Sequence, residues 1–245
     1  MSKPSGKDKK PAAKTGPLAR LWNERDRDGM TEKLIAEGGK LLEKSPQDYE
    51  VRWQLARAEW WLADRSKDSE GKRIHGQRGY EHGEKAVAIN PDGVEGYTWY
   101  AAALGEYGLG ISIIKALFQG LDGKFRKQCQ QAIEIDAGYD GGAPLRAMGR
   151  LYAKLPFPKQ DLRRSRELLE EASKLAPERF LTRIYLAETM IALGRPQEAL
   201  PHLKVVFKNK PCAEDKADHA HLLALAAEVA KSVPGGEELL EKSKK

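Results

Sequence analysis

Apolar residues recur with a helical period between residues 180 and 211. In Phe180–Leu193 they stand mostly three and four positions apart, which predicts a helix with one buried face. Gly194 suits the C-terminal cap of that helix, and Pro196 is tolerated in the first turn of the next one. A second apolar pattern then continues to Pro211. The stretch therefore predicts two antiparallel helices joined by a tight turn.

The pattern of a second helix that ends at a proline recurs upstream. The stops are Pro46, Pro91, Ala137, Pro177 and Pro211, with the proline missing only at 137. From Pro177 to Pro211 the spacing is 34 residues, the period of the tetratricopeptide repeat. The sequence therefore predicts an all-α fold, a tetratricopeptide-like right-handed α-solenoid of about four to five antiparallel helix pairs.

The earlier units are longer than this period, with spacings of 45, 46 and 40 residues between stops. The excess is predicted between the two helices of each pair, at Asp64–Ile74, Gly108–Lys124 and Leu155–Asp161. Insertions on one face of a solenoid often carry its function.

A single helical domain is expected over residues 17–245. Repeats are expected at 49–91, 94–137, 143–177 and 180–211, between a cap hairpin at 17–46 and capping helices at 214–245. Residues 1–16 hold five lysines and one aspartate, so this segment accounts for most of the net charge of +6. We expect it to be a disordered basic tail. Because the remaining chain is nearly neutral, no nucleic-acid partner is expected.

Cysteine content and hydropathy indicate the cellular compartment of the protein. Cys129 and Cys212 are the only cysteines, which gives no disulfide framework. No segment approaches the roughly 18 apolar residues that a membrane span requires, and no signal-peptide or lipid-anchoring pattern is visible. We therefore expect a cytoplasmic protein with no membrane span, or a periplasmic one if a leader has been removed.

Motifs for catalysis, metals and cofactors are weak. His219 and His221 are two positions apart, so on a helix they face different ways and make a poor metal site. Gly108–Gly110 follows no strand and lacks the lysine of a phosphate-binding loop. No nucleophile elbow is present. The sequence predicts a protein that is not an enzyme and has no cofactor.

Two stretches resemble known families. Asp136–Leu145, with Gly141-Gly142 before a helix and Pro156 after its last aromatic residue, resembles the T component associated with tripartite (TRAP) transporters. Gly79–Tyr100 is similar to the regulator of microtubule dynamics family. Both families are tetratricopeptide relatives, so both resemblances imply this fold. The first also implies a transport accessory that helps a periplasmic solute receptor.

In this architecture the first helix of each pair lines a concave groove, and residues one step around from the core should point into it. This selects a set of groove residues: Gln54, Trp61, Trp99, Arg146, Arg150, Tyr185 and Glu188. Aromatic rings beside Arg146 and Arg150 would suit a peptide or an acidic solute. Alternatively, Trp61 and Trp99 only fill gaps between repeats.

The 108–124 insertion is unusually apolar. Ile113, Leu117 and Phe118 should cover a helix face, form a contact in a homo-oligomer, or line a pocket. The leading hypothesis is a non-catalytic adaptor whose groove binds a protein segment. The alternative is a transport accessory or small-solute-binding protein, which an enclosed cavity walled by the insertion would favour. Self-assembly is a third hypothesis, and a solution mass above one chain would support it.

Overall fold

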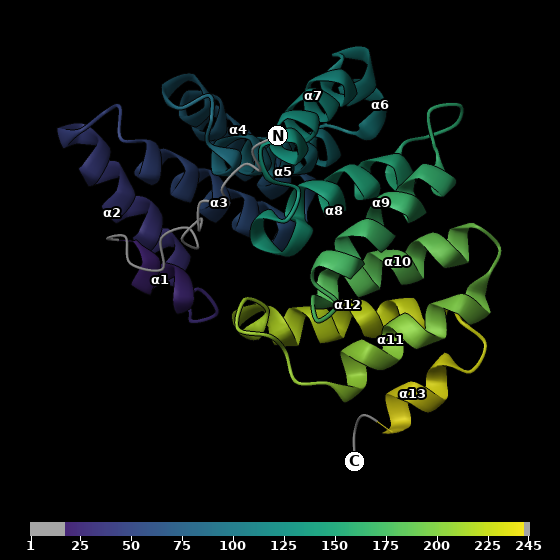
Figure 1. The fold of residues 1–245 in the computed structure, drawn as a ribbon. Coiled ribbons are helices and arrows are strands. Elements are labelled where there is room, and N and C mark those ends of the chain that lie inside the picture. The colour runs from purple at the N-terminus through teal and green to yellow at the C-terminus, as the bar shows by residue number, and fades with distance from the viewer. Residues whose placement is uncertain (1–17, 243–245) are drawn as a thin grey trace, which may run out of the picture.

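The computed structural model describes residues 18–242, and this part of the chain is helical without strands (Figure 1). The α-helices are α1 (Ala19–Asn23), α2 (Met30–Lys44), α3 (Tyr49–Arg65), α4 (Ser69–Ile89), α5 (Val94–Gly110), α6 (Ile113–Phe118), α7 (Leu121–Asp136), α8 (Tyr139–Lys154), α9 (Leu162–Leu175), α10 (Phe180–Ala192), α11 (Ala199–Lys208), α12 (His219–Lys231) and α13 (Gly236–Lys242). Short 3₁₀ turns at Pro196–Glu198 and Lys216–Asp218 precede α11 and α12. The expected tail at 1–16 lies outside the described residues.

Consecutive helices pack as pairs, and each pair packs on the next. The pairs are α3 with α4, α5 with α7, α8 with α9, and α10 with α11. The short helices α1 and α2 pack against the start of the array, and α12 and α13 pack against its end. This succession is the one that the repeated second-helix pattern predicts.

Aspartate side chains fix where several of these helices begin. Asp48 accepts a hydrogen bond from the backbone N–H of Val51 at 3.1 Å, at the start of α3. Asp68 does the same at α4, and Asp161 does so at α9. Each carboxylate satisfies an amide that has no partner within the helix, and its charge suits the positive end of the helix dipole.

The core is a series of apolar clusters at the contacts between units. In one of them, Leu169 of α9 packs with Phe180 and Ile184 of α10 and with Leu203 of α11. All four side chains are at most 1% exposed. A second cluster joins α5, α7, α8 and α9 around Leu145 and the buried Cys129. Because each helix buries residues against two neighbours, the array has one continuous interior.

Helices α4 and α5 approach each other closely because glycines face the neighbouring backbone. A Cβ at Gly83 would lie 2.6 Å from the Cα of Tyr100, and one at Gly76 would lie 2.4 Å from the amide nitrogen of Tyr107. Any side chain larger than hydrogen would force the two helices apart.

The structure does not contain the insertion expected at Asp64–Ile74. Helix α3 continues to Arg65 and α4 begins at Ser69, so only residues 66–68 form the turn. The extra length of this unit lies in a longer pair of helices. By contrast, residues 155–161 do connect α8 to α9, and residues 108–124 contain the separate helix α6.

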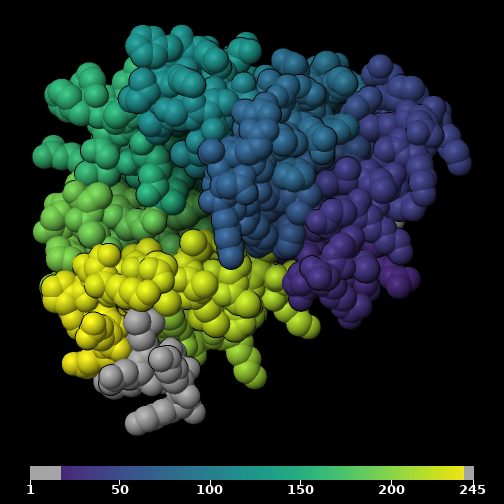
Figure 2. Space-filling model, turned by 180° about the vertical axis from the view of Figure 1, so that it is seen from behind, coloured from purple at the N-terminus to yellow at the C-terminus, as the bar shows by residue number. Residues whose placement is uncertain are grey.

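The two ends of the array come near each other. Helix α12 returns toward α1 and α3, so the chain curls around its own inner face (Figure 1). Seen from behind, the yellow C-terminal segment lies against the blue and purple N-terminal segment (Figure 2). The contacts between the two ends partly enclose the concave face of the array.

Candidate partner-binding cavity

The inner face of the array surrounds a cavity of about 1930 Å³. Its wall comes chiefly from the first helices of the pairs, α3, α5, α8 and α10, together with α1, α6 and residues 213–222. Since positions three and four apart share one face of a helix, each first helix contributes a stripe of side chains.

On α3 the stripe differs from the expected one. The residues of α3 that line the cavity are Tyr49, Glu50, Trp53, Arg57, Trp60, Asp64 and Arg65. Gln54 is 2% exposed and donates from its amide to Glu50 Oε2 at 3.3 Å. Neither Gln54 nor Trp61 lines the cavity, and Glu188 of α10 does not line it either. A shift of one position rotates a side chain by about 100° around the helix axis, and the sequence pattern does not fix the phase of α3 that finely.

Four other expected residues, Trp99, Arg146, Arg150 and Tyr185, do lie on the wall. Arg150 pairs with Glu188, and its Cζ lies 4.1 Å from the centroid of the Tyr185 ring. Burial raises the pKa of the Tyr185 hydroxyl, although Arg150 opposes the shift. The structure thus joins α8 to α10 through these three side chains. Their role in binding stays a prediction.

Trp99 is held firmly in the wall. Its side chain is 5% exposed, and its indole Nε1 donates to Tyr139 Oη at 3.0 Å. Its ring centroid lies 5.1 Å from that of Trp60. Trp99, on α5, therefore packs against α3 and α8 and is almost fully buried in the cavity wall.

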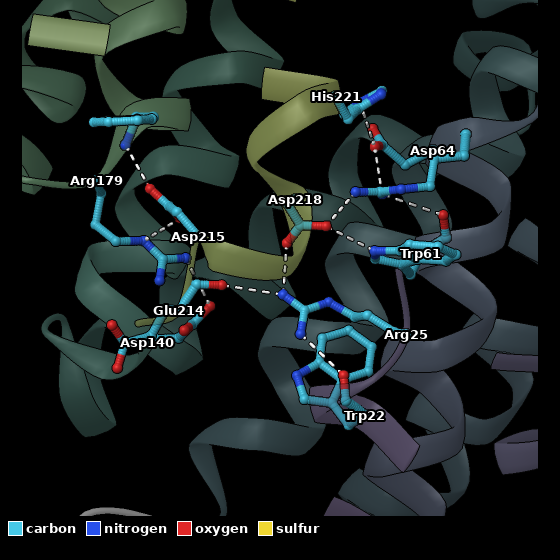
Figure 3. A network of polar contacts seen from close by, with 12 residues as sticks. Trp22, Arg25, Trp61, Asp64, Asp140, Arg179, Glu214, Asp215, Asp218 and His221 are labelled. Atoms are coloured by element: carbon cyan, nitrogen blue, oxygen red, sulfur yellow. Dashed lines mark hydrogen bonds and ion pairs between the residues drawn. The ribbon is translucent and has the colours of Figure 1, made fainter. Parts of the chain in front are cut away.

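A cluster of polar contacts joins the two ends of the array (Figure 3). Asp218 accepts hydrogen bonds from the Arg25 guanidinium at 2.6 Å and from the Trp61 indole at 2.8 Å. Arg65 also pairs with Asp218, and its Cζ lies 3.9 Å from the centroid of the Trp61 ring. Arg25 donates in addition to the backbone oxygen of Glu214 at 3.0 Å. We call Arg25, Trp61, Arg65 and Asp218 the end-to-end cluster.

A second set of charges extends this cluster toward α4 and α5. His221 Nε2 lies 3.3 Å from an Asp64 carboxylate oxygen. Burial opposes ionisation of Asp64, but His221 and Arg65 outweigh it and hold the pKa of that carboxyl below its ordinary value. Lys72 pairs with Glu106, whose pKa is raised by burial and by the nearby Asp64. The carboxylates on this side of the wall are therefore paired.

An unusual turn opens α8. Asp140, Gly141 and Gly142 all have positive φ, at 45°, 62° and 77°. Glycine adopts this left-handed conformation without strain, which explains the Gly-Gly pair in the sequence. The turn places the Asp140 carboxylate 3.5 Å from Arg179 and 3.8 Å from Arg146. Arg146 of α8 and Arg179, which directly precedes α10, thus each face a protein carboxylate.

Helix α6 stands at one edge of the cavity. Ile113 and Leu117 line it, whereas Phe118 points away from it with 89% of its surface exposed. The insertion thus forms part of the cavity wall and also presents an apolar residue outward. Whether a second copy covers Phe118 stays a prediction, tested by whether Phe118→Glu lowers the mass in solution.

The sequence gives little sign of several residues that shape this cavity, namely Trp22, Arg25, Arg57 and Asp218. Arg25 and Asp218 are 193 positions apart, so no local spacing relates them. Trp22 and Arg25 stand in a short cap helix and the turn after it, where periodicity is weak. Arg57 could have been found by shifting the phase of α3 by one position.

The described residues, 18–242, bear on metal binding and on membrane insertion. In that part of the chain, no group of three or more His, Cys, Asp or Glu side chains is placed to hold a metal ion. None of the helices found there is long and apolar enough to cross a membrane.

A solved structure with the same arrangement of helices identifies the fold. A thermophilic TPR protein in Thermus thermophilus is similar with a TM-score of 0.65 and 19% sequence identity, over 90% of this chain and 98% of that one. MamA is similar with a TM-score of 0.49 and 15% identity, over 84% of this chain and 98% of its own. This chain has the tetratricopeptide-type solenoid fold.

Family models match two parts of this tetratricopeptide-type chain. The model for regulator of microtubule dynamics protein 1-3 matches residues 22–140, which include the Gly79–Tyr100 stretch that resembles that family. The CNOT10 tetratricopeptide repeat domain model matches residues 155–228. Together they support a tetratricopeptide-like protein over most of the described residues.

The resemblance to the transporter T component is not shown by these matches, so the expected transport role has no support from them. None of the curated proteins matches the chain in sequence.

Proposed function

We propose that this protein is a non-catalytic adaptor that holds a segment of a protein partner in its interior cavity. The observation that carries the proposal is the size of the cavity, about 1930 Å³. Sites for small molecules occupy about 300–1000 Å³. The cavity therefore has room for a peptide or a helix, and it is larger than a single small solute needs.

The lining also suits a protein segment. It combines large aromatic side chains, such as Trp53, Trp60 and Tyr185, with arginines such as Arg57 and Arg150. Tryptophan, tyrosine and arginine dominate the energetics of protein interfaces, because they bury much surface and carry directed hydrogen bonds. These side chains stand on the helices α3, α8 and α10, so they are held in place before a partner arrives.

The test compares two double variants as baits for proteins of the native source. Arg150→Ala/Glu188→Ala removes both members of an ion pair at the cavity. Lys154, 3.9 Å from Glu188, loses a partner, but its side chain is 47% exposed and water can solvate it. Arg164→Ala/Glu167→Ala removes a matched pair on the outer surface of α9. We expect the natural chain and the α9 variant to retain the same partner and the cavity variant to lose it.

Circular dichroism and thermal unfolding should show that both variants are folded. If a folded Arg150→Ala/Glu188→Ala variant retains the partner as strongly as the natural chain does, the cavity is not the binding surface. Loss of the partner by the α9 variant alone would instead place binding on the outer face.

A further inference from the structure

Arg57 differs from every other arginine on the cavity wall within residues 18–242. Each of the others has a carboxylate oxygen within 4.0 Å. These are Arg25, Arg27, Arg65, Arg146, Arg150 and Arg179. Arg57 makes no ion pair and no hydrogen bond in this part of the chain, and its Nε atom is buried without a partner.

The surroundings of Arg57 are aromatic. Its Cζ lies 3.8 Å from the ring centroid of Trp22, 4.8 Å from that of Trp53 and 5.8 Å from that of Trp99. We call Arg57 with these three tryptophans the indole box. All four residues line the cavity. The faces of indole rings attract a cation, so the box holds the guanidinium without supplying any hydrogen-bond acceptor.

Arg57 remains charged although it is buried. Desolvation lowers the pKa of the guanidinium to about 10, with a smaller contribution from Arg25. The group is therefore protonated at neutral pH and carries five N–H donors. A buried donor that lacks an acceptor costs stability, and a buried charge that lacks a partner costs more.

Two carboxylates whose charges act on Arg57, those of Asp140 and Glu50, are committed to other groups. Glu50 accepts from the Gln54 amide at 3.3 Å, and Asp140 faces Arg146 and Arg179. Neither lies within 4.0 Å of the Arg57 guanidinium. Because a guanidinium is shaped to bind a carboxylate through two parallel hydrogen bonds, the acceptor that is missing here would come from a molecule in the cavity.

We propose that the indole box is a subsite for one acidic side chain of the bound partner segment, with its carboxylate on Arg57. This inference rests on the adaptor function and names the chemistry of its ligand. Glu50 and Glu95 also line the cavity next to the box, and their negative charges disfavour a cluster of acids or a phosphate dianion. The box therefore selects a single carboxylate among neutral or apolar neighbours.

The test uses acetylated and amidated pentapeptides with leucines around a central glutamate, a central glutamine, or three consecutive glutamates. Binding to the full chain is followed by tryptophan fluorescence, because three of the five tryptophans form the box. We expect the single-glutamate peptide to bind about tenfold more tightly than the glutamine peptide, as one charge-assisted hydrogen-bonded pair would provide. The three-glutamate peptide should bind more weakly than the single-glutamate one.

Two variants assign this preference to a residue. Arg57→Gln should remove the difference between the glutamate and glutamine peptides. Arg52→Gln is the matched control, because Arg52 lies on the same helix and donates to the Pro46 carbonyl away from the cavity. It should retain the full preference. Equal binding of the two peptides by the natural chain, or an unchanged preference in Arg57→Gln, would overturn the inference.

Two further measurements cover the remaining outcomes. If Arg57→Gln fails to fold, nuclear magnetic resonance of the natural chain replaces it. The Arg57 Nε–H resonance should shift when the glutamate peptide is added and not when the glutamine peptide is added, and equal shifts would overturn the proposal. A glutamine peptide with a free C-terminal carboxylate is also tested. If it binds as tightly as the glutamate peptide, the proposal that the box binds an acidic side chain is overturned. Equal binding of all the peptides leaves the adaptor function standing, which the partner-capture experiment decides separately.

Discussion

The Arg25 guanidinium lies 2.6 Å from the Asp218 carboxylate, a contact between residues 193 positions apart. It connects the cap hairpin at the start of the array to the turn that precedes α12 (Figure 3). In a solenoid whose units contact only their neighbours, stability adds up along the chain. A direct contact between the ends changes this, because opening the curl then requires breaking the end-to-end cluster.

Replacing Asp218 by asparagine should loosen the curl. The substitution removes the charge that Arg25 and Arg65 share, and Arg25 is 6% exposed, so water cannot fully compensate. We expect a loss of about 2 kcal/mol in the free energy of unfolding, as for hydrogen bonds to charged groups. Chemical denaturation measures the loss, and small-angle scattering should show a larger radius of gyration.

Glu214→Gln is the control for this variant. It removes one negative charge from the same segment, but Arg25 contacts only the backbone oxygen of Glu214. Stability and radius should stay close to those of the natural chain. An Asp218→Asn protein with an unchanged radius would mean that packing alone holds the curl closed.

The close approach of α4 and α5 predicts opposite effects for two glycine substitutions. In Gly83→Ala the new methyl group would lie 2.6 Å from the Cα of Tyr100, so the helices must separate, at a cost of about 2 kcal/mol. In Gly39→Ala the methyl group meets nothing within 4 Å in the interior of α2, and alanine should stabilise the helix by up to about 1 kcal/mol. Thermal unfolding of both variants tests the pair. Equal effects of the two substitutions would contradict the close packing.

Much of the fold follows from local pattern. Helix stops at Pro46, Pro91, Pro177 and Pro211, with their apolar spacing, predict the succession of pairs, because proline and the 3.6-residue period act within a few positions. The same pattern places Trp99, Arg146, Arg150 and Tyr185 on the inner wall.

The features that the sequence pattern does not predict depend on contacts between distant residues or on the exact rotation of a helix about its axis. The end-to-end cluster requires the cumulative curvature of the whole array, which no single repeat encodes. The stripe of α3 was misplaced because Trp53, Trp60 and Trp61 make that helix apolar on more than one face, so periodicity does not select the phase. Arg57 is unpaired because the carboxylates near it pair with other groups, and this pairing is a property of the folded cavity.

The hydrogen bond from the Trp99 indole to Tyr139 Oη, at 3.0 Å, predicts a cost for Tyr139→Phe. The change keeps the ring but leaves a buried N–H without an acceptor, which should cost about 1–2 kcal/mol. Tyr107→Phe is the control, because the Tyr107 ring packs edge-on to Tyr80 with 5.2 Å between centroids and its hydroxyl has no such role. Chemical denaturation compares the two, and equal losses would show that the Trp99 bond contributes nothing measurable.

One polar arrangement occurs twice in the array and predicts a pH effect. Arg52 donates to the Pro46 carbonyl and lies 3.3 Å from His82 Nδ1, and Arg183 stands in the same relation to Pro177 and His202. Burial, with help from Arg52 and Lys85, lowers the pKa of His82 to about 4.

Because the ordinary pKa of histidine is near 6.5, the unfolded chain takes up a proton at this site before the folded chain does. The contribution of His82 to stability is therefore complete above about pH 6.5 and falls as the pH drops toward 4. Nuclear magnetic resonance should show the folded His82 ring titrating near pH 4, and Arg52→Gln should raise this value. His82→Gln should flatten the loss of stability between these pH values relative to the natural chain. A folded His82 that titrates near 6.5 would contradict the arrangement, since burial beside a fixed guanidinium cannot leave the proton affinity of the ring unchanged.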